Sequence, residues 1–459
     1  MKDSRRIDRC LEHVKCGRII VHLLVILFGV STWIGVNGIF IELPLLVNVT
    51  PEGWNLPAYI VIVAQSANVG PVIYAFLYKS KCQPNETLCI LCLLCSQILA
   101  TGLLIFFYDK TIIIGTKKYS LILLISVFFN ALVGCFSSVL FMPYLRNFDH
   151  VYIVSYFVGE GLSGVLPSIV ALIQGVGERE TCDILTNTTK IISLNAPDLK
   201  FSGKYYFLFL ALVLVLSLVA FIVLRYSSFV QMNRSLRHNL LTQIKVDYSK
   251  RNEPDITVNA FRNNNVDHAL AKESDNASGV SFIKTNSVSS FRKTYLYTLI
   301  GICCFFSNGF LPSIQSYSCL PYGHLAYQLA IVCTQFINPL SCFLILWIMV
   351  SDIRIINFLS LTCLIAGCYV TYAALLSPTP PLQKSVVGVG LIIFSWTILM
   401  GVVSYLKLVI LSLLKHISSS KALFNVGLVM QIGSAAGAII SFVLINFTDC
   451  FEMYNFCSV

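Results

Sequence analysis

The sequence predicts an all-α integral membrane protein with about eleven transmembrane helices in two pseudo-repeated halves. Of its 459 residues, 56% are hydrophobic and only 12% are charged, whereas soluble proteins carry roughly a quarter charged residues. The mean hydropathy is +0.77. The apolar residues form runs of the length, about 20 residues, that a helix needs to cross a ~30 Å hydrocarbon core. Polar and apolar residues do not alternate within these runs, which excludes a β-barrel.

The apolar runs divide into six before a polar stretch and five after it. The first six lie near 19–40, 56–78, 88–108, 119–145, 151–174 and 205–225. The other five lie near 295–315, 324–349, 354–377, 386–410 and 420–447. The stretch between them is rich in Asn, Ser, Lys and Arg and has few aromatic residues, which is typical of a mostly disordered linker. The predicted organisation is an N-terminal tail (1–18), a first membrane half (19–225), the linker (226–294), a second membrane half (295–447) and a C-terminal tail (448–459).

The distribution of positive charge predicts the orientation. The N-terminal tail carries Arg5, Arg6, Arg9, Lys15 and Arg18. The segments expected on its side of the membrane hold more Lys and Arg than those on the other side, which favours a cytoplasmic N terminus. An odd number of spans then places the C terminus and the 175–204 loop outside. The net charge of +10 belongs beside anionic inner-leaflet lipid, and no folded basic domain suggests a nucleic-acid partner.

The extracellular segments contain candidate modification sites. Asn187 begins an Asn-Thr-Thr sequon in the 175–204 loop and is the best glycosylation candidate. Asn48 and Asn446 are weaker candidates because they crowd the membrane surface. On this oxidising side, one or two disulfides are compatible with four of the 17 cysteines: Cys182, Cys319, Cys450 and Cys457. The CxxC spacings at Cys89, Cys92 and Cys95 fall in an apolar run, so they predict packing and not a metal site.

Glycine motifs in the membrane runs predict close helix packing. Residues 159–164 read GEGLSG and match the dinucleotide fingerprint GxGxxG. That fingerprint requires a soluble βαβ unit, and here the motif lies inside a transmembrane run. Small residues let helices approach closely in lipid, and Gly433 with Gly437 forms a second pair of this kind.

Glu160 is the one deep carboxylate in the predicted spans. Counting from 151, the helical rise places it roughly 14 Å into the membrane. A charge at that depth costs at least ~2.5 kcal/mol, so its side chain should face a cavity or a partner. Two interpretations are open, a substrate or proton-coupling role and a neutral packing role. Glu42 and Glu52 are expected at the outer boundary, where exposure costs little, and Lys407 is expected to reach the inner interface.

A polar layer at the depth of Glu160 predicts a substrate site. A single polar residue at this depth is more often a helix-packing contact than part of a binding site. Six different spans nevertheless contribute to one level, as a midplane site requires. The layer consists of Trp33, Gln65, Asn68, Asn308, Gln335, Asn338, Trp396 and Gln431. Asn-Gly pairs at 37–38 and 308–309, each followed by Pro, predict interrupted helices in corresponding spans of the two halves.

These residues resemble the riboflavin transporters of the solute carrier class. In the first half the matching stretches are NGIFIELPLL (37–46), PEGW (51–54), LP (56–57), QSANVGP (65–71), GEGLSG (159–164) and LP (166–167). In the second half they are NG (308–309), LPS (311–313), YSCL (317–320), YG (322–323), NPL (338–340), SW (395–396) and SYLK (404–407). The resemblance covers both membrane halves and implies eleven spans, a cytoplasmic N terminus and uptake of riboflavin at the plasma membrane.

The chemistry of riboflavin suggests roles for the polar residues. Trp33 and Trp396 suit the flat ring, and Gln65, Asn68, Asn308 and Gln431 suit its hydrogen-bonding edge. Glu160 and Ser163 suit the ribityl hydroxyls, and Glu160 is also the candidate for proton coupling. Asn37, Gln335 and Asn338 complete the predicted site. Replacing Gln65 or Trp396 by Ala is expected to raise the Km without loss of surface expression.

Two other function classes stay open at this point. One is a carrier for another flat heterocycle, such as a nucleoside or nucleobase, and the other is a membrane receptor or sensor that binds without transporting. An enzyme is not expected, because the sequence shows no nucleotide-binding loop, metal cluster or catalytic triad. No cofactor is expected either, since riboflavin would be the substrate. The expected partners are this small molecule and the lipid bilayer, without nucleic acid.

Overall fold

The computed structural model describes residues 18–79, 84–145, 148, 150–175, 181–183, 193–195, 199–227, 290–348, 350–417 and 420–454. Nine helices among these residues are long and apolar enough to cross a membrane, and up to eleven if each of two bent helix pairs is one span. The all-helical membrane fold predicted from the sequence is therefore confirmed. Most of the predicted linker, from residue 228 to 289, lies outside the described residues.

The first half contains helices and two short hairpins. Its first helix covers Arg18–Val30. The helices that follow are α2 (Ile34–Ile41), α3 (Leu43–Val49), η1 (Gly53–Asn55), α4 (Leu56–Ser66), α5 (Val69–Lys79), α6 (Glu86–Phe107), α7 (Leu121–Phe136), the π-helix η2 (Ser137–Phe141), α8 (Met142–Leu145), α9 (His150–Gln174) and α10 (Gly203–Tyr226). The hairpins pair β1 (Ile112–Ile114) with β2 (Lys117–Tyr119), and β3 (Thr181–Asp183) with β4 (Ser193–Asn195), both antiparallel.

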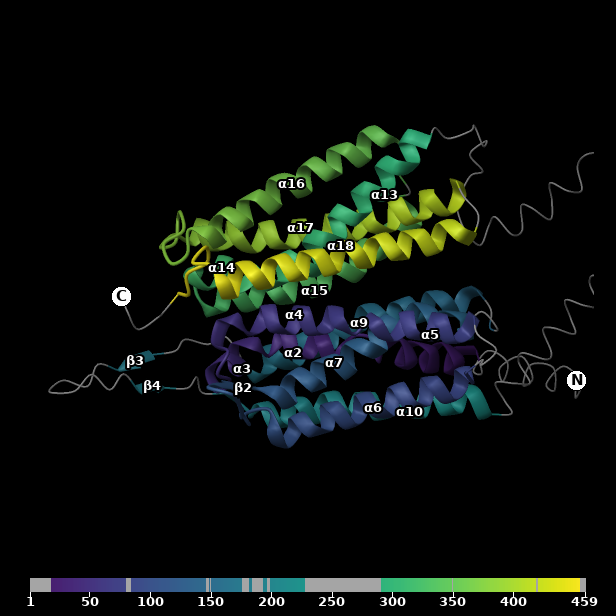
Figure 1. Ribbon diagram of the computed structural model, residues 1–459, viewed down its shortest axis with the longest axis horizontal. Coiled ribbons are helices and arrows are strands. Elements are labelled where there is room, and N and C mark those ends of the chain that lie inside the picture. The colour runs from purple at the N-terminus through teal and green to yellow at the C-terminus, as the bar shows by residue number, and fades with distance from the viewer. Residues whose placement is uncertain are drawn as a thin grey trace, which may run out of the picture.

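All the regular secondary structure among the described residues of the second half is helical. Its elements are α13 (Ser290–Cys304), the π-helix η3 (Phe305–Phe310), α14 (Leu311–Cys319), η4 (Leu320–Tyr322), α15 (His324–Trp347), α16 (Ile353–Leu375), α17 (Val386–Ile417) and α18 (Ser420–Phe447). Figure 1 shows the helices of each half gathered in one bundle, with the two bundles lying side by side. The bundles meet where α4 packs on α14 and α18, and where α9 packs on α15.

Of the two interrupted helices that the sequence predicts, the first span is bent, whereas the seventh span is one continuous helical segment, Phe291–Tyr322, that contains a π-helix. The first span bends by 55° between Val30 and Ile34, and α2 ends before Pro44, which opens α3 at its first turn. In the seventh span, η3 contains Asn308 and ends before Pro312, which opens α14 in the same way. Proline is tolerated in a first turn, where its missing N–H has no partner to lose.

Corresponding glycine crossings in the two halves support the pseudo-repeat. A Cβ on Gly159 of α9 would lie 2.1 Å from the Ile26 carbonyl oxygen of the first helix. A Cβ on Gly433 of α18 would lie 2.3 Å from the Gly301 carbonyl oxygen of α13. The first and fifth spans therefore cross at a glycine, and so do the seventh and eleventh. These are the close approaches that the glycine motifs predict.

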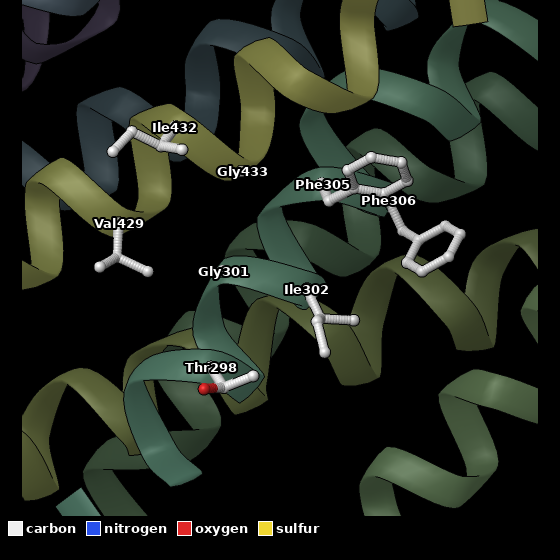
Figure 2. Close-up of a pocket in the computed structure, with 8 residues that line it drawn as sticks. All are labelled: Thr298, Gly301, Ile302, Phe305, Phe306, Val429, Ile432 and Gly433. Atoms are coloured by element: carbon white, nitrogen blue, oxygen red, sulfur yellow. The ribbon is translucent and has the colours of Figure 1, made fainter. Parts of the chain in front are cut away.

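The halves differ in what covers these crossings. In the first half, Val30 and Ile34 are 1% and 0% exposed and share a buried cluster with Leu210 and Leu214 of α10. In the second half, the described residues contain no sixth long helix, and Ile302 is 50% exposed. An apolar groove lies between α13, η3 and α18 (Figure 2), lined by Thr298, Gly301, Ile302, Phe305, Phe306, Val429, Ile432 and Gly433. With one polar side chain, the groove does not coincide with the predicted polar layer.

Candidate functional site

The first half contributes a polar cluster built around Glu160. The indole of Trp33, at the bend of the first span, lies beside the Glu160 carboxylate. One turn further along α9, the Ser163 hydroxyl donates to the Glu160 carbonyl oxygen at 2.6 Å. Asn37 Nδ2 of α2 donates to Ser163 Oγ at 3.3 Å. Four of the predicted site residues are therefore brought together: Trp33, Asn37, Glu160 and Ser163.

The second half contributes a cluster centred on Asn308 in the π-helix η3. Lys407 Nζ of α17 donates to Asn308 Oδ1 at 3.1 Å and to Ser307 Oγ at 3.2 Å. Asn308 Nδ2 donates to Ser434 Oγ of α18 at 3.2 Å. The cluster joins three spans, and π-bulges of this kind occur frequently at functional sites. Lys407 thus bonds within the protein at the middle of the seventh span, whereas the sequence suggested that it reaches the inner interface.

Gln65 links the first half to the Asn308 cluster of the second half. Gln65 Nε2, at the end of α4, donates to the Asn308 main-chain oxygen at 3.3 Å. Asn68 Nδ2 in turn donates to Gln65 Oε1 at 3.1 Å. A hydrogen-bonded chain therefore runs from Asn68 through Gln65 and Asn308 to Lys407, and it crosses between the bundles where a midplane site would lie.

Three further predicted residues lie around these clusters. Gln335 of α15 packs against Gly164, where an added Cβ would lie 2.1 Å from Gln335 Oε1. Asn338 lies one turn further along α15 and is exposed. Gln431 of α18 is also exposed, and it lies on the same helix face as Phe442, three turns away. The ring centroids of Phe442 and of Tyr59 in α4 lie 5.0 Å apart. This face of α18 therefore turns toward the first half.

Trp396 occupies a different environment from the other predicted residues. It is 1% exposed in the core of the second half, and its indole N–H donates to Ser318 Oγ at 3.0 Å. The neighbouring Cys319 is a free, buried thiol. In this conformation Trp396 is a packing residue that no ligand reaches, so Trp33 is the tryptophan of the pair that lies within the polar clusters.

Contacts between the halves gather toward the end of the bundles that carries β2, β3 and β4 (Figure 1). The Tyr317 hydroxyl of α14 donates to Asn55 Oδ1 at 2.6 Å. Trp54 packs edge-on against Tyr327 of α15, with ring centroids 5.5 Å apart. Gln328 Nε2 reaches the Ala171 carbonyl oxygen of α9 at 3.5 Å. These contacts close this end over the polar clusters.

The two acidic residues expected at the outer boundary are not simply exposed. Glu42 lies just past Ile41, the last residue of the first span, and its side chain is 0% exposed. Glu52 accepts hydrogen bonds from the Ser120 amide and hydroxyl, both at 2.8 Å. Sequence depth alone does not reveal that the chain folds back over Glu42.

The predicted modification sites are described only in part. Cys319 and Cys450 are free thiols in the structure, whereas Cys457 and the Cys182 side chain lie outside what is described, as does Asn187. Asn48 is exposed, and Asn446 Nδ2 donates to the Phe442 carbonyl oxygen at 2.9 Å. Within the described part of the chain, no group of three or more His, Cys, Asp or Glu residues is placed to hold a metal ion.

Sequence reasoning missed several residues that join the clusters or the halves. Ser307, Lys407 and Ser434 bond directly to Asn308, and Tyr317 bonds to Asn55. The SYLK and YSCL stretches of the family resemblance contained Lys407 and Tyr317. The polar side chains within these two stretches were the signal in the sequence that could have identified both residues.

Comparison with known proteins decides the family. The family model described as "Solute carrier family 52, riboflavin transporter" matches residues 17–453. The chain belongs to this riboflavin transporter family. It is 33% identical to riboflavin transporter member 3-A of Danio rerio, with 95% of this chain and 98% of the relative covered. It is 32% identical to member 3 of Homo sapiens, with 96% and 98% covered.

Solved structures of solute transporters share the fold of this family member. The nucleoside transporter NupG matches with a TM-score of 0.51 at 10% identity, with 94% of each chain covered. A D-xylose–proton symporter matches with a TM-score of 0.51 at 13% identity, with 93% of this chain and 87% of that chain covered. At these identities the likeness concerns the fold alone.

Proposed function

We propose that this chain transports riboflavin across the plasma membrane into the cell, by alternating access at a site between its two halves. The observation that carries the proposal is the match of a riboflavin transporter family model to residues 17–453. A transporter role, not an enzymatic one, agrees with the transporter fold. Each half supplies a polar cluster at one level, which is the arrangement of a midplane substrate site.

The two clusters suit the chemistry of riboflavin. Trp33 offers an aromatic face for the flat ring, worth roughly 0.5–1.5 kcal/mol beyond burial for a good stack. Gln65, Asn68 and Asn308 offer donors and acceptors for the polar ring edge. Glu160 lies in the cluster of the first half with Ser163 and Asn37, where hydroxyl groups of the ribityl chain would find acceptors.

The distribution of contacts supports an inward-facing state for this conformation. In the proposed orientation the N terminus is cytoplasmic and the C terminus extracellular. The contacts of Asn55 with Tyr317 and of Trp54 with Tyr327 then close the extracellular end. Asn338 and Gln431, toward the other end, are exposed. Transport would require these extracellular contacts to open as the bundles rock about the polar layer.

The test is uptake of radiolabelled riboflavin by cells that express this chain, at acidic and neutral pH. Excess unlabelled riboflavin, uridine or adenine serves as the competitor, and surface biotinylation reports the amount of protein at the plasma membrane. Saturable uptake blocked by riboflavin alone is the expected result. No uptake above background with the protein at the surface would contradict the proposal, and block by uridine or adenine would favour a carrier for another heterocycle.

Glu160 is the proposed proton-coupling group within this function. It is the deep carboxylate among the polar clusters, and it lies near Tyr156, Cys342 and Trp33. If uptake depends on pH, the Glu160→Gln variant should lose that dependence while it still reaches the surface. An unchanged pH profile in this variant would remove Glu160 from coupling.

A further inference from the structure

This inference rests on the proposed function and concerns how the substrate is held. Lys407 is half-buried and supplies a positive charge to the polar clusters. The ion pair found among the described residues joins Lys110 to Asp109, so no described carboxylate oxygen lies within 4 Å of the Lys407 ammonium. Its acceptors are instead two neutral oxygens, Ser307 Oγ and Asn308 Oδ1. A cation in this position attracts an electron-rich ligand group.

The hydrogen bonds around Asn308 position the Lys407 ammonium and leave one of its N–H donors available. Asn308 Oδ1 accepts from both Lys407 Nζ and Ser307 Oγ, which occupies its two lone pairs. Asn308 Nδ2 is held by Ser434. An ammonium has three N–H donors, and two of them point to these oxygens. The third is available to a ligand, and the side chain is already positioned, so binding costs little ordering.

The two halves present opposite chemistry to a bound molecule. Lys407 only donates hydrogen bonds, whereas an ionised Glu160 only accepts them. Both charges lie close enough to the Cys342 thiol of α15 to act on it, so they are near the same residue. A riboflavin molecule has carbonyl acceptors at one end, on the pyrimidine ring, and hydroxyl donors at the other, on the ribityl chain.

We propose that Lys407 donates a hydrogen bond to a pyrimidine carbonyl oxygen of the bound flavin, with the ribityl chain directed toward Glu160 and Ser163. The ring edge is then held by the second half and the ribityl chain by the first. The substrate bridges the two bundles, so its binding energy acts on their relative position. Lys407 is a substrate-binding and orienting residue in this arrangement.

The test compares two ligands in uptake and competition assays on whole cells. Riboflavin has both groups that the proposal uses, the pyrimidine carbonyl and the ribityl chain. Lumiflavin keeps the ring but has a methyl group in place of the ribityl chain. In Lys407→Met, the riboflavin Km and the lumiflavin inhibition constant should both rise by about tenfold or more, as expected for a lost hydrogen bond to a charged group. Lys407→Arg should recover part of the loss because it keeps the charge.

A variant at the proposed ribityl end of the site should affect riboflavin and lumiflavin differently. Ser163→Ala should raise the riboflavin Km several-fold while the lumiflavin inhibition constant stays unchanged. Lys118→Met serves as the matched control, because Lys118 is exposed on the β1–β2 hairpin, and it should leave both constants unchanged. Surface biotinylation normalises the rates for every variant.

Three outcomes would overturn the inference. The first is a Lys407→Met variant with a lower Vmax but unchanged constants for both ligands, since that pattern means that Lys407 only supports η3. The second is a loss of riboflavin affinity without a loss of lumiflavin affinity, since that reverses the orientation. The third is failure of both Lys407 variants to reach the surface. If the unaltered chain carries no riboflavin, the proposed function itself has failed, and this result is distinct from the other three.

Discussion

Gln174 Nε2 donates to Glu42 Oε1 across 3.0 Å in a fully buried position beside the end of the first span. The other oxygen of each side chain, Glu42 Oε2 and Gln174 Oε1, has no hydrogen-bond partner. A proton on Glu42 Oε2 would allow a second hydrogen bond to Gln174 Oε1, because a carboxylic acid and an amide can form two reciprocal hydrogen bonds. Burial raises the pKa of the Glu42 carboxyl from 4.5 to about 8, although the Gln174 hydrogen bond lowers it.

Glu42→Gln is therefore expected to remove a pH dependence of stability. Between pH 4.5 and about 8, the folded protein keeps a proton that the unfolded chain has lost. The free energy of unfolding then decreases as the pH rises through this range, by at most about 1.4 kcal/mol per pH unit. The amide keeps both hydrogen bonds without a titrating proton. Thermal unfolding of purified protein in detergent across this range measures the effect, and equal slopes for variant and parent would refute the neutral pair.

Tyr317→Phe is expected to favour opening of the extracellular end. The variant loses the hydrogen bond to Asn55 Oδ1 but keeps the ring, which packs 5.5 Å from Phe451. A net loss of about 1 kcal/mol shifts the ratio of closed to open states by about fivefold. In a protein that carries Asn68→Cys, adding Tyr317→Phe should speed labelling of the new cysteine by a membrane-impermeant maleimide. The same protein without the Asn68→Cys change gives the background labelling. Unchanged labelling would mean that the bond does not contribute to closure.

Gly159→Ala should destabilise the crossing of α9 with the first helix. The new methyl group would meet the Ile26 carbonyl oxygen, which is main chain and cannot turn aside. Overpacking of this kind costs typically 1–3 kcal/mol, so surface expression and thermal stability should both fall. Gly102→Ala in α6 is the control, because a Cβ there has no neighbour within 4 Å. Similar losses in both variants would show that the close approach is not the cause.

The hydropathy pattern was sufficient to predict the helical membrane fold. It could not show which way each side chain points. Lys407 and Trp396 illustrate the reason, because depth along a span follows from the helical rise but orientation requires an amphipathic face. In an apolar span lipid and protein select similar residues, so that face carries little signal. The structure turns Lys407 toward Asn308 and Trp396 into the core.

Trp396 and Gln65 are now expected to respond differently to replacement by Ala. Gln65→Ala removes one half-buried hydrogen bond to Asn308, so the riboflavin Km should rise about fivefold while surface expression is kept. Trp396→Ala instead leaves a large cavity in the core and removes the hydrogen bond to Ser318. Its cost of about 3–5 kcal/mol should deplete the protein from the surface, whereas Trp396→Phe should retain part of it. Surface biotinylation with uptake kinetics separates the two effects. A Trp396→Ala variant with normal surface expression and a raised Km would instead return Trp396 to the substrate site, which requires a conformation that exposes its indole.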